Sequence, residues 1–183
     1  MRSTALKALV LTIALALAPS PGAAQSTELD QLFEQLADPD TQNWQQVETR
    51  IWALWAHSGS AAMDLLLVRG REAMGNGDMD AAIEHFTALT DHAPDFAEGW
   101  NARATAYYLA GMFGPSIQDI QRTLALNPRH FGALSGLGMI LAQMDMPKEA
   151  LDAYRAALAI NPQKTSTQTT IEQLEKLVGG TEL

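Results

Sequence analysis

The sequence predicts an all-α protein of one domain, and three observations support this prediction. The composition is rich in Ala and Leu and contains only 7% aromatic residues, and Ala and straight-chain residues lose little conformational freedom in a helix. A proline-containing segment recurs every 34 residues, and between the prolines the apolar residues follow a helical period. At 183 residues the chain is long enough for one domain with a substantial core.

Residues 1–24 are predicted to be a targeting segment that is not part of the fold. The start is basic, with Arg2 and Lys7, and an uncharged apolar run from Ala8 to Ala18 follows. Two prolines and small residues then precede Ala24, after which we expect signal-peptide cleavage. The apolar run has 11 residues, whereas a membrane-spanning helix needs about 20, so cleavage is favoured over an uncleaved anchor. We therefore expect an exported protein, periplasmic or extracellular, with no membrane span after processing.

Charge and cysteine content narrow the classes of site and partner. The chain contains no cysteine, which excludes disulfides, thiolate metal sites and a lipid attached to cysteine. Its formal net charge of −9 becomes −11 once the two basic residues of the targeting segment are removed. A strongly acidic protein repels nucleic acid and anionic membrane surfaces. We therefore expect no nucleic-acid partner and favour a neutral or basic protein.

Prolines define three repeat units of equal length. Pro94, Pro128 and Pro162 are each 34 residues apart, and the last two follow the similar segments Leu-Ala-Leu-Asn and Leu-Ala-Ile-Asn. Internal periodicity in this range indicates a solenoid of stacked supersecondary units. The predicted units comprise residues 63–164 and divide into 63–96, 97–130 and 131–164.

Small and apolar side chains recur at equivalent positions of these units. With about 100° per residue, positions 4, 7, 8 and 11 share one helix face, and positions 20, 24 and 27 share a face of a second helix. Small residues at positions 8 and 20 should let the two helices approach closely, and a bulky residue at position 24 should fill the gap toward the next unit. The first unit carries Leu66, Gly70, Ala82, Phe86, Leu89 and Pro94, and the third carries Leu134, Leu137, Gly138, Leu141, Ala150, Tyr154, Ala157 and Pro162.

The period and these side chains resemble the tetratricopeptide-repeat (TPR) family. The resemblance implies a right-handed α-α superhelix, a TPR solenoid, that binds another protein or a peptide. The middle unit departs from the pattern at four packing positions, which hold Arg103, Ser116, Ile120 and Thr123. This departure concerns the packing of the middle unit, and the unit itself is still expected.

Helical segments are expected on both sides of the repeats. Residues 25–62 are interpreted as an N-terminal helical cap, a degenerate repeat whose longer helix carries Trp44, Trp52 and Trp55. The tryptophans either seal the N-terminal end of the solenoid, because a terminal repeat must bury its open face, or form a binding platform. Residues 165–183 are interpreted as a C-terminal solvating helix, which caps the last repeat, and a tail.

The sequence contains no recognised motif of an active site or a metal centre. A Gly-rich phosphate loop, a serine nucleophile elbow and an H-E-x-x-H zinc motif are all missing. The four histidines, His57, His85, His92 and His130, show no metal-ligand spacing. The segment 76–80 fits a turn with a helix N-cap better than a calcium loop. We therefore predict a non-enzymatic protein with no cofactor and no metal.

The first helix of each unit is predicted to line the concave face of the superhelix. Positions 2, 5, 9 and 12 point away from the packing face. The predicted peptide-binding groove consists of Leu67, Arg71, Met74, Asn101, Thr105, Tyr108, Ser135 and Met139. The remaining groove positions hold Asp64, Glu98, Gly132 and Ala142.

This predicted groove is mixed, with apolar patches at Leu67, Met74, Tyr108 and Met139 and few charges. Such a lining suits an extended or helical segment that is held through side-chain pockets. The leading hypothesis is therefore a protein–protein interaction adaptor or scaffold of the cell envelope. The alternative is a structural module that self-associates into a homo-oligomer through its Trp-rich N-terminal end.

Overall fold

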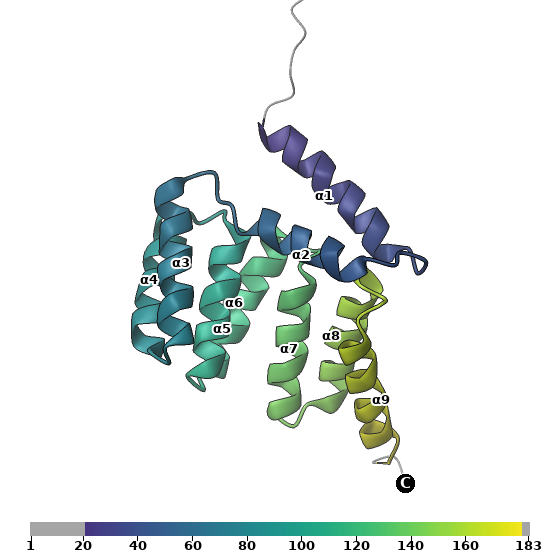
Figure 1. Ribbon diagram of the computed structural model, residues 1–183. Coiled ribbons are helices and arrows are strands. Elements are labelled where there is room, and N and C mark those ends of the chain that lie inside the picture. The colour runs from purple at the N-terminus through teal and green to yellow at the C-terminus, as the bar shows by residue number, and fades with distance from the viewer. Residues whose placement is uncertain (1–20, 181–183) are drawn as a thin grey trace, which may run out of the picture.

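The computed structural model describes residues 21–180, which form nine α-helices and no strand. Six of these helices form three antiparallel pairs that stand side by side (Figure 1). The pairs are α3 (Ala61–Gly75) with α4 (Met79–His92), α5 (Ala97–Leu109) with α6 (Phe113–Leu126), and α7 (Phe131–Gln143) with α8 (Pro147–Ile160). Each pair corresponds to one predicted repeat unit. The all-α prediction is confirmed for this part of the chain.

A glycine on the first helix and a ring on the second join the helices of the outer pairs. A Cβ atom added at Gly70 would lie 2.3 Å from the Phe86 ring, and one added at Gly138 would lie 2.7 Å from the Tyr154 ring. Each ring thus packs over the glycine of its own unit, whereas the sequence suggested that it fills the gap toward the next one. Phe86 also belongs to a core cluster that includes Ala102 of the next pair.

The turn between the two helices of each pair uses a residue with a left-handed backbone. Gly77, Gly111 and Asp145 have φ angles of 81°, 75° and 60°, and they occupy the same position of the three repeats. A positive φ costs little at glycine and more at a residue with a Cβ atom. After the first of these turns, Asp78 caps α4 by accepting a hydrogen bond from the N–H of Ala81 at 3.0 Å.

The two N-terminal helices do not occupy the place next to α3 where a preceding repeat would stack. Instead of running alongside α3, α2 (Trp44–Trp55) crosses the ends of the later helix pairs, and α1 (Pro21–Ala37) packs on α2 (Figure 1). A core cluster joins these two helices to the start of α7 and contains Phe33, Leu36, Val47, Ile51, Trp55 and Phe131. The two helices expected in the cap are therefore present, but α2 lies across the repeats and α1 packs on α2.

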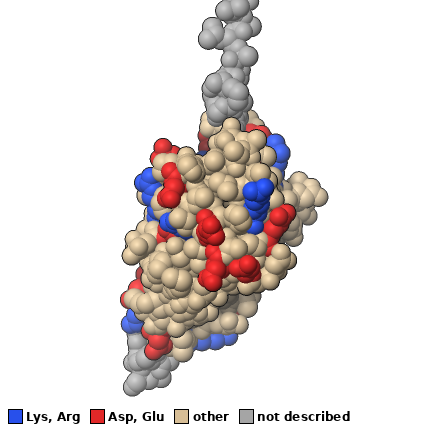
Figure 2. Space-filling model, turned by 90° about the vertical axis from the view of Figure 1, so that its left-hand side faces the viewer, with Lys and Arg blue, Asp and Glu red and all other residues tan. Residues whose placement is uncertain are grey.

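This placement leaves the α3 end of the solenoid open. Leu65 and Val68 of α3 are 47% and 48% exposed. Figure 2 shows this end of the molecule, where acidic and basic side chains are scattered around a broad area that carries neither.

The opposite end is covered by α9 (Thr165–Gly180). Its Ile171 and Leu174 form a core cluster with Ala150 and Leu151 of α8. This packing is that of a helix which covers the apolar face of the last pair.

Most of the predicted targeting segment lies outside the described residues. Its last four residues, 21–24, form the first turn of α1, where a proline is tolerated because the N–H groups of a first turn have no intrahelical partner. Across residues 21–180, no helix has both the length and the apolar character that crossing a membrane requires.

Candidate functional site

A hollow between α5 and α7 lies on the face that the sequence predicted for binding. It contains about 320 Å³ of empty space, and we call it the α5–α7 pocket. Its rim is formed by Asn101, Thr105 and Tyr108 of α5 and by Gly132, Gly136 and Met139 of α7. Ala104, Ile120 and Ile140 contribute an apolar floor. Four of the eight predicted groove residues therefore line this pocket.

Two further hollows continue from α7 toward α9. The α2–α9 pocket, of about 430 Å³, lies between α2, α7 and the start of α9, and the α7–α9 pocket of about 500 Å³ lies beside it. Ser135, a predicted groove residue, lines both of these pockets together with Lys164 and Thr167. Met139 lines both the α7–α9 and the α5–α7 pocket. The three adjoining pockets are called the concave groove below.

Tyr108 and Gln143 bridge α5 and α7 at the end of the groove that lies away from α2. Gln143 Nε2 donates a hydrogen bond of 2.6 Å to Tyr108 Oη. Because the phenol oxygen accepts this bond, Tyr108 can still donate its own hydrogen to a bound segment. The Tyr108 ring also lies beside Phe113, with 5.9 Å between ring centroids.

Two predicted groove residues belong to the core. Leu67 is 1% exposed, and Met74 packs against the same core cluster. This cluster includes Ala102 and Ala106 of α5, whose small side chains let α3 approach closely. The expectation that Leu67 lines an open groove is therefore wrong, because the approach of α3 fills the space between the first two units.

Arg71, also predicted to line the groove, instead neutralises the buried carboxylate of Glu98. Glu98 is 3% exposed, and its Oε1 lies 2.5 Å from Arg71 Nη2. Its Oε2 accepts a hydrogen bond from Asn101 Nδ2 at 3.1 Å and lies 3.0 Å from His130 Nε2. His130 Nδ1 accepts the backbone N–H of Ala133 at 3.1 Å, so the imidazole hydrogen resides on Nε2 and is donated to Glu98. Three donors thus compensate the burial of this charge.

The tryptophans of α2 cover this polar cluster. Trp55 stacks on the His130 ring, with 4.2 Å between centroids and an interplanar angle of 15°. Trp52 meets Phe131 edge to face, and a Cβ atom added at Gly132 would lie 2.3 Å from the Trp52 ring. Trp55 is only 8% exposed. Trp52 and Trp55 therefore attach α2 to the middle of the repeat array and do not seal the N-terminal end of the solenoid, which was one of the two expected roles.

Polar contacts attach α2 to the start of α9 as well. Glu48 forms an ion pair of 2.6 Å with Lys164 and accepts a hydrogen bond of 3.2 Å from Asn161 Nδ2. These partners lie 116 and 113 residues away in the chain, so no local sequence pattern could reveal them. Through Glu48 and Trp52, α2 forms one wall of the α2–α9 pocket.

Comparison with known proteins identifies the family of this chain. The family described as "Tetratricopeptide repeat" matches residues 67–114 and, in a second match, residues 131–164. A TPR repeat-containing protein of Rhizobium etli is 34% identical over 200 aligned positions, which cover 98% of this chain and 97% of that protein. The chain belongs to the TPR family.

Solved structures of other proteins, two of them TPR domains, show the same fold. The Sgt2 TPR domain of Aspergillus fumigatus has a TM-score of 0.63 and 22% identity, covering 67% of this chain and 83% of that domain. The first TPR of Spaghetti, bound to an HSP90 peptide, has a TM-score of 0.62 and 22% identity and covers 64% and 93%. The Yersinia enterocolitica type III secretion chaperone SycD, bound to a peptide of the translocator YopD, has a TM-score of 0.60 and 14% identity and covers 63% and 94%. The TPR solenoid fold predicted from the sequence is therefore confirmed.

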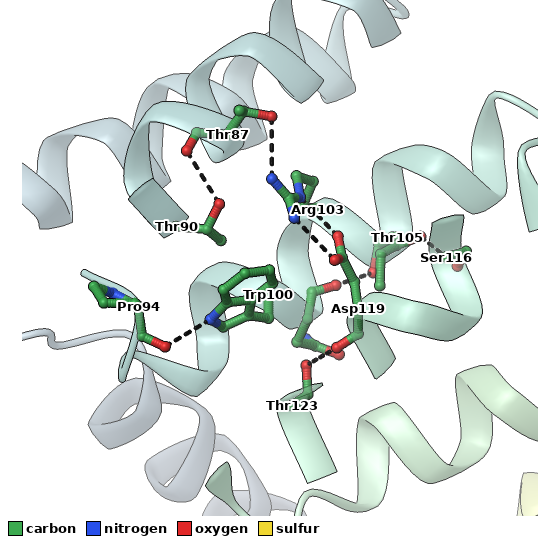
Figure 3. A network of polar contacts seen from close by, with 11 residues as sticks. Thr87, Thr90, Pro94, Trp100, Arg103, Thr105, Ser116, Asp119 and Thr123 are labelled. Atoms are coloured by element: carbon green, nitrogen blue, oxygen red, sulfur yellow. Dashed lines mark hydrogen bonds and ion pairs between the residues drawn. The ribbon is translucent and has the colours of Figure 1, made fainter. Parts of the chain in front are cut away.

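The middle TPR unit contains a second polar network, at the positions where it departs from the family pattern (Figure 3). Arg103 Nε and Nη2 donate to the two carboxylate oxygens of Asp119 at 2.7 and 2.9 Å. The hydrogen bonds to Asp119 raise the pKa of Arg103 against the opposing effect of burial. Arg103 also donates to Thr87 at 3.3 Å and lies over the Trp100 ring at 4.8 Å. Because all of these contacts are internal, the network stabilises the TPR array and is not a candidate ligand site.

The remaining ionisable groups show no constellation typical of catalysis. Among residues 21–180, no three His, Asp or Glu side chains come together in a way that could hold a metal ion. Asp64, at a predicted groove position, accepts hydrogen bonds from the backbone N–H and the hydroxyl of Ser58 at 2.8 and 2.6 Å. Burial acts to raise the pKa of Asp64, but the bonds from Ser58 and the contact with His57 outweigh it and lower the pKa. Asp64 thereby secures the loop before α3.

Proposed function

We propose that this TPR protein is a non-enzymatic adaptor or scaffold that binds a peptide segment of another protein in the concave groove. The observation that carries the proposal is the row of three adjoining pockets along α7, with Met139, 41% exposed, shared by the α5–α7 and α7–α9 pockets. A partly exposed apolar side chain between hollows with polar rims is typical of a peptide-binding surface. Two proteins of similar fold have a peptide bound, one from HSP90 and one from YopD, which supports the same use of this groove.

The lining of the groove favours recognition of side chains over recognition of a chain terminus. Arg71 is committed to Glu98, and Lys164 is committed to Glu48. A terminal carboxylate would have to compete with these internal acids for its cations. The apolar floor of the α5–α7 pocket, which includes Ile120 and Ile140, suits an apolar side chain of the bound segment.

A pair of matched methionine substitutions tests this binding surface. Met139→Arg places a bulky charge between the pockets, whereas Met144→Arg changes a methionine of similar exposure, 45%, just beyond α7. Peptides would be selected on the purified protein from a displayed random library, and their affinities measured by fluorescence anisotropy. We expect Met139→Arg to weaken binding about 30-fold, the equivalent of about 2 kcal/mol at a hot spot, and Met144→Arg to leave it unchanged.

Melting temperatures close to that of the unmodified protein would show that both variants are folded. Equal affinities for the two variants would contradict the groove as the binding surface. The self-association alternative receives no support from the packing of Trp52 and Trp55 on α7. Sedimentation equilibrium checks it directly, because a stable dimer would favour the alternative.

We further propose that the adaptor works outside the cytoplasm, in the periplasm or the extracellular space. The support is the order of basic start, apolar run and small-residue site in residues 1–24. Mass spectrometry of the protein expressed in a Gram-negative host should find a mature chain that begins at Gln25. Recovery of the chain with Met1 from the cytoplasm would contradict export.

A further inference from the structure

A buried hydrogen-bond acceptor without a donor lies beside the α2–α9 pocket. Asn161 lines this pocket and is 2% exposed, and its Oδ1 has no hydrogen-bond partner among the described residues. Its Nδ2 donates to Glu48 Oε2 at 3.2 Å. Because a carboxylate can only accept, the amide of Asn161 cannot be turned round to present Oδ1 to Glu48. A buried acceptor in this state destabilises the protein until a donor reaches it.

The equivalent asparagine one repeat earlier shows what Asn161 lacks. Asn127 Oδ1 accepts the backbone N–H of Arg129 at 3.2 Å, a local turn that satisfies the side-chain oxygen. At Asn161 the amide is drawn toward Glu48 of α2. The crossing of α2 over the repeats has therefore drawn the amide of Asn161 away from the local turn that Asn127 forms.

The rest of the pocket combines donors and acceptors between aromatic walls. Lys164 Nζ lies 2.6 Å from Glu48 Oε1, so the two charges compensate each other. The hydroxyl of Thr167 can donate or accept. Trp52 and Phe131 also line the pocket. A ligand that fits these walls is neutral, planar and able both to donate and to accept a hydrogen bond.

We propose that the α2–α9 pocket is a subsite for a primary carboxamide, the side chain of an Asn or Gln in the bound segment. The proposal rests on the peptide-binding function proposed above and names one specificity element of it. The carboxamide N–H supplies the donor that Asn161 Oδ1 lacks, and the carboxamide oxygen accepts from the Thr167 hydroxyl. Because Lys164 and Glu48 compensate each other, the pocket offers no unpaired countercharge to a cationic or an anionic group, so both are disfavoured.

Small probes test the subsite without any peptide. The full ¹⁵N-labelled chain would be titrated with acetamide, with N,N-dimethylacetamide, which has no N–H, and with acetate, which is anionic. We expect acetamide to cause saturable shifts of the Asn161 side-chain amide and the Thr167 backbone amide, with a dissociation constant of about 100 mM or tighter for so small a fragment. The other two probes should bind at least 10-fold more weakly. Equal binding of either of them, or no saturable shift with acetamide, would overturn the proposal.

Two asparagine variants provide the matched control. Asn161→Ala should abolish the saturable shift at Thr167, whereas Asn127→Ala, at the same repeat position, should leave it unchanged. If Asn161→Ala lowers the melting temperature too far for titration, Thr167→Val replaces it, with the Asn161 side-chain amide as the reporter and the same expected loss. Acetamide binding that survives the variant tested would overturn the assignment.

The two proposals can fail separately. If Met139→Arg leaves peptide binding intact while the acetamide titration behaves as expected, the groove proposal is wrong and the carboxamide site remains. If peptides bind in the groove but acetamide does not bind, the subsite alone is wrong.

Discussion

The second and third repeats hold their helix pairs together by different means. In the third repeat the Tyr154 ring packs over Gly138, and the contact is apolar. In the second repeat a hydroxyl and an ion pair take over much of this role, since Ser116 Oγ donates to the carbonyl oxygen of Ala104 at 2.7 Å. Equivalent helix pairs are thus built with a tight apolar contact in one unit and a buried polar network in the other.

This difference indicates which substitutions each repeat tolerates. A buried ion pair adds little net stability over apolar residues of the same shape, but removing one partner leaves the other charge buried without compensation. A glycine under a ring tolerates no added volume without displacement of the ring. The second repeat should therefore be sensitive to the loss of a partner, and the third repeat to the gain of a methyl group.

The largest effect is expected from Asp119→Ala in the second repeat. Arg103 is only 13% exposed in its side chain, so loss of Asp119 should lower the free energy of unfolding by about 3 kcal/mol. Adding Arg103→Leu to this variant gives the second repeat the residues that the third has at these positions, Leu137 and Ala153, and should recover most of the loss. Urea unfolding measures both values. If Asp119→Ala alone were as stable as the unmodified protein, the ion pair would not contribute to the free energy of unfolding.

Smaller effects on stability, opposite in sign to each other, are expected from alanine substitutions at two glycines of α7. Gly138→Ala should destabilise the third repeat by about 1–3 kcal/mol, because its Cβ would lie 2.7 Å from the Tyr154 ring. At Gly136 the added Cβ would lie 3.8 Å from Ile120 Cδ1, an ordinary contact, so Gly136→Ala should stabilise α7 by about 0.5–1 kcal/mol. Thermal unfolding should rank Gly136→Ala above the unmodified protein and Gly138→Ala below it. The same shift in both variants would refute the tight contact.

The smallest effect is expected where the turns of the two repeats differ. Asp145 of the third repeat has a φ of 60°, whereas the second repeat has Gly111 at the same position with a φ of 75°. Asp145→Gly should therefore stabilise the protein by about 0.5 kcal/mol, and Gly111→Asp should destabilise it by a similar amount. Paired melting curves would detect the two opposite shifts, and shifts of the same sign would argue against backbone strain at Asp145.

The sequence by itself determined the fold class, because helical periodicity and the 34-residue period are local properties. Each repeat has one small residue on its first helix and another on its second helix, such as Gly138 and Ala150. This local pattern specifies a closely packed helix pair in every repeat. The α5–α7 part of the groove was predictable for the same reason. Tyr108 and Met139 lie on helix faces whose direction follows from their position in the repeat.

Only the tertiary structure decided where α2 packs and what it does to the groove. The apolar face of α2 is visible in the sequence, but an amphipathic helix does not encode which of several apolar surfaces it will cover. That choice depends on complementarity over long separations, such as the Trp52 ring above Gly132 and Glu48 beside Lys164. The same contacts left Asn161 Oδ1 without a donor, and the approach of α3 to α5 left Arg71 bound to Glu98. Each of these outcomes depends on a contact between two segments that are distant in the sequence, and a pattern within one segment does not predict such a contact.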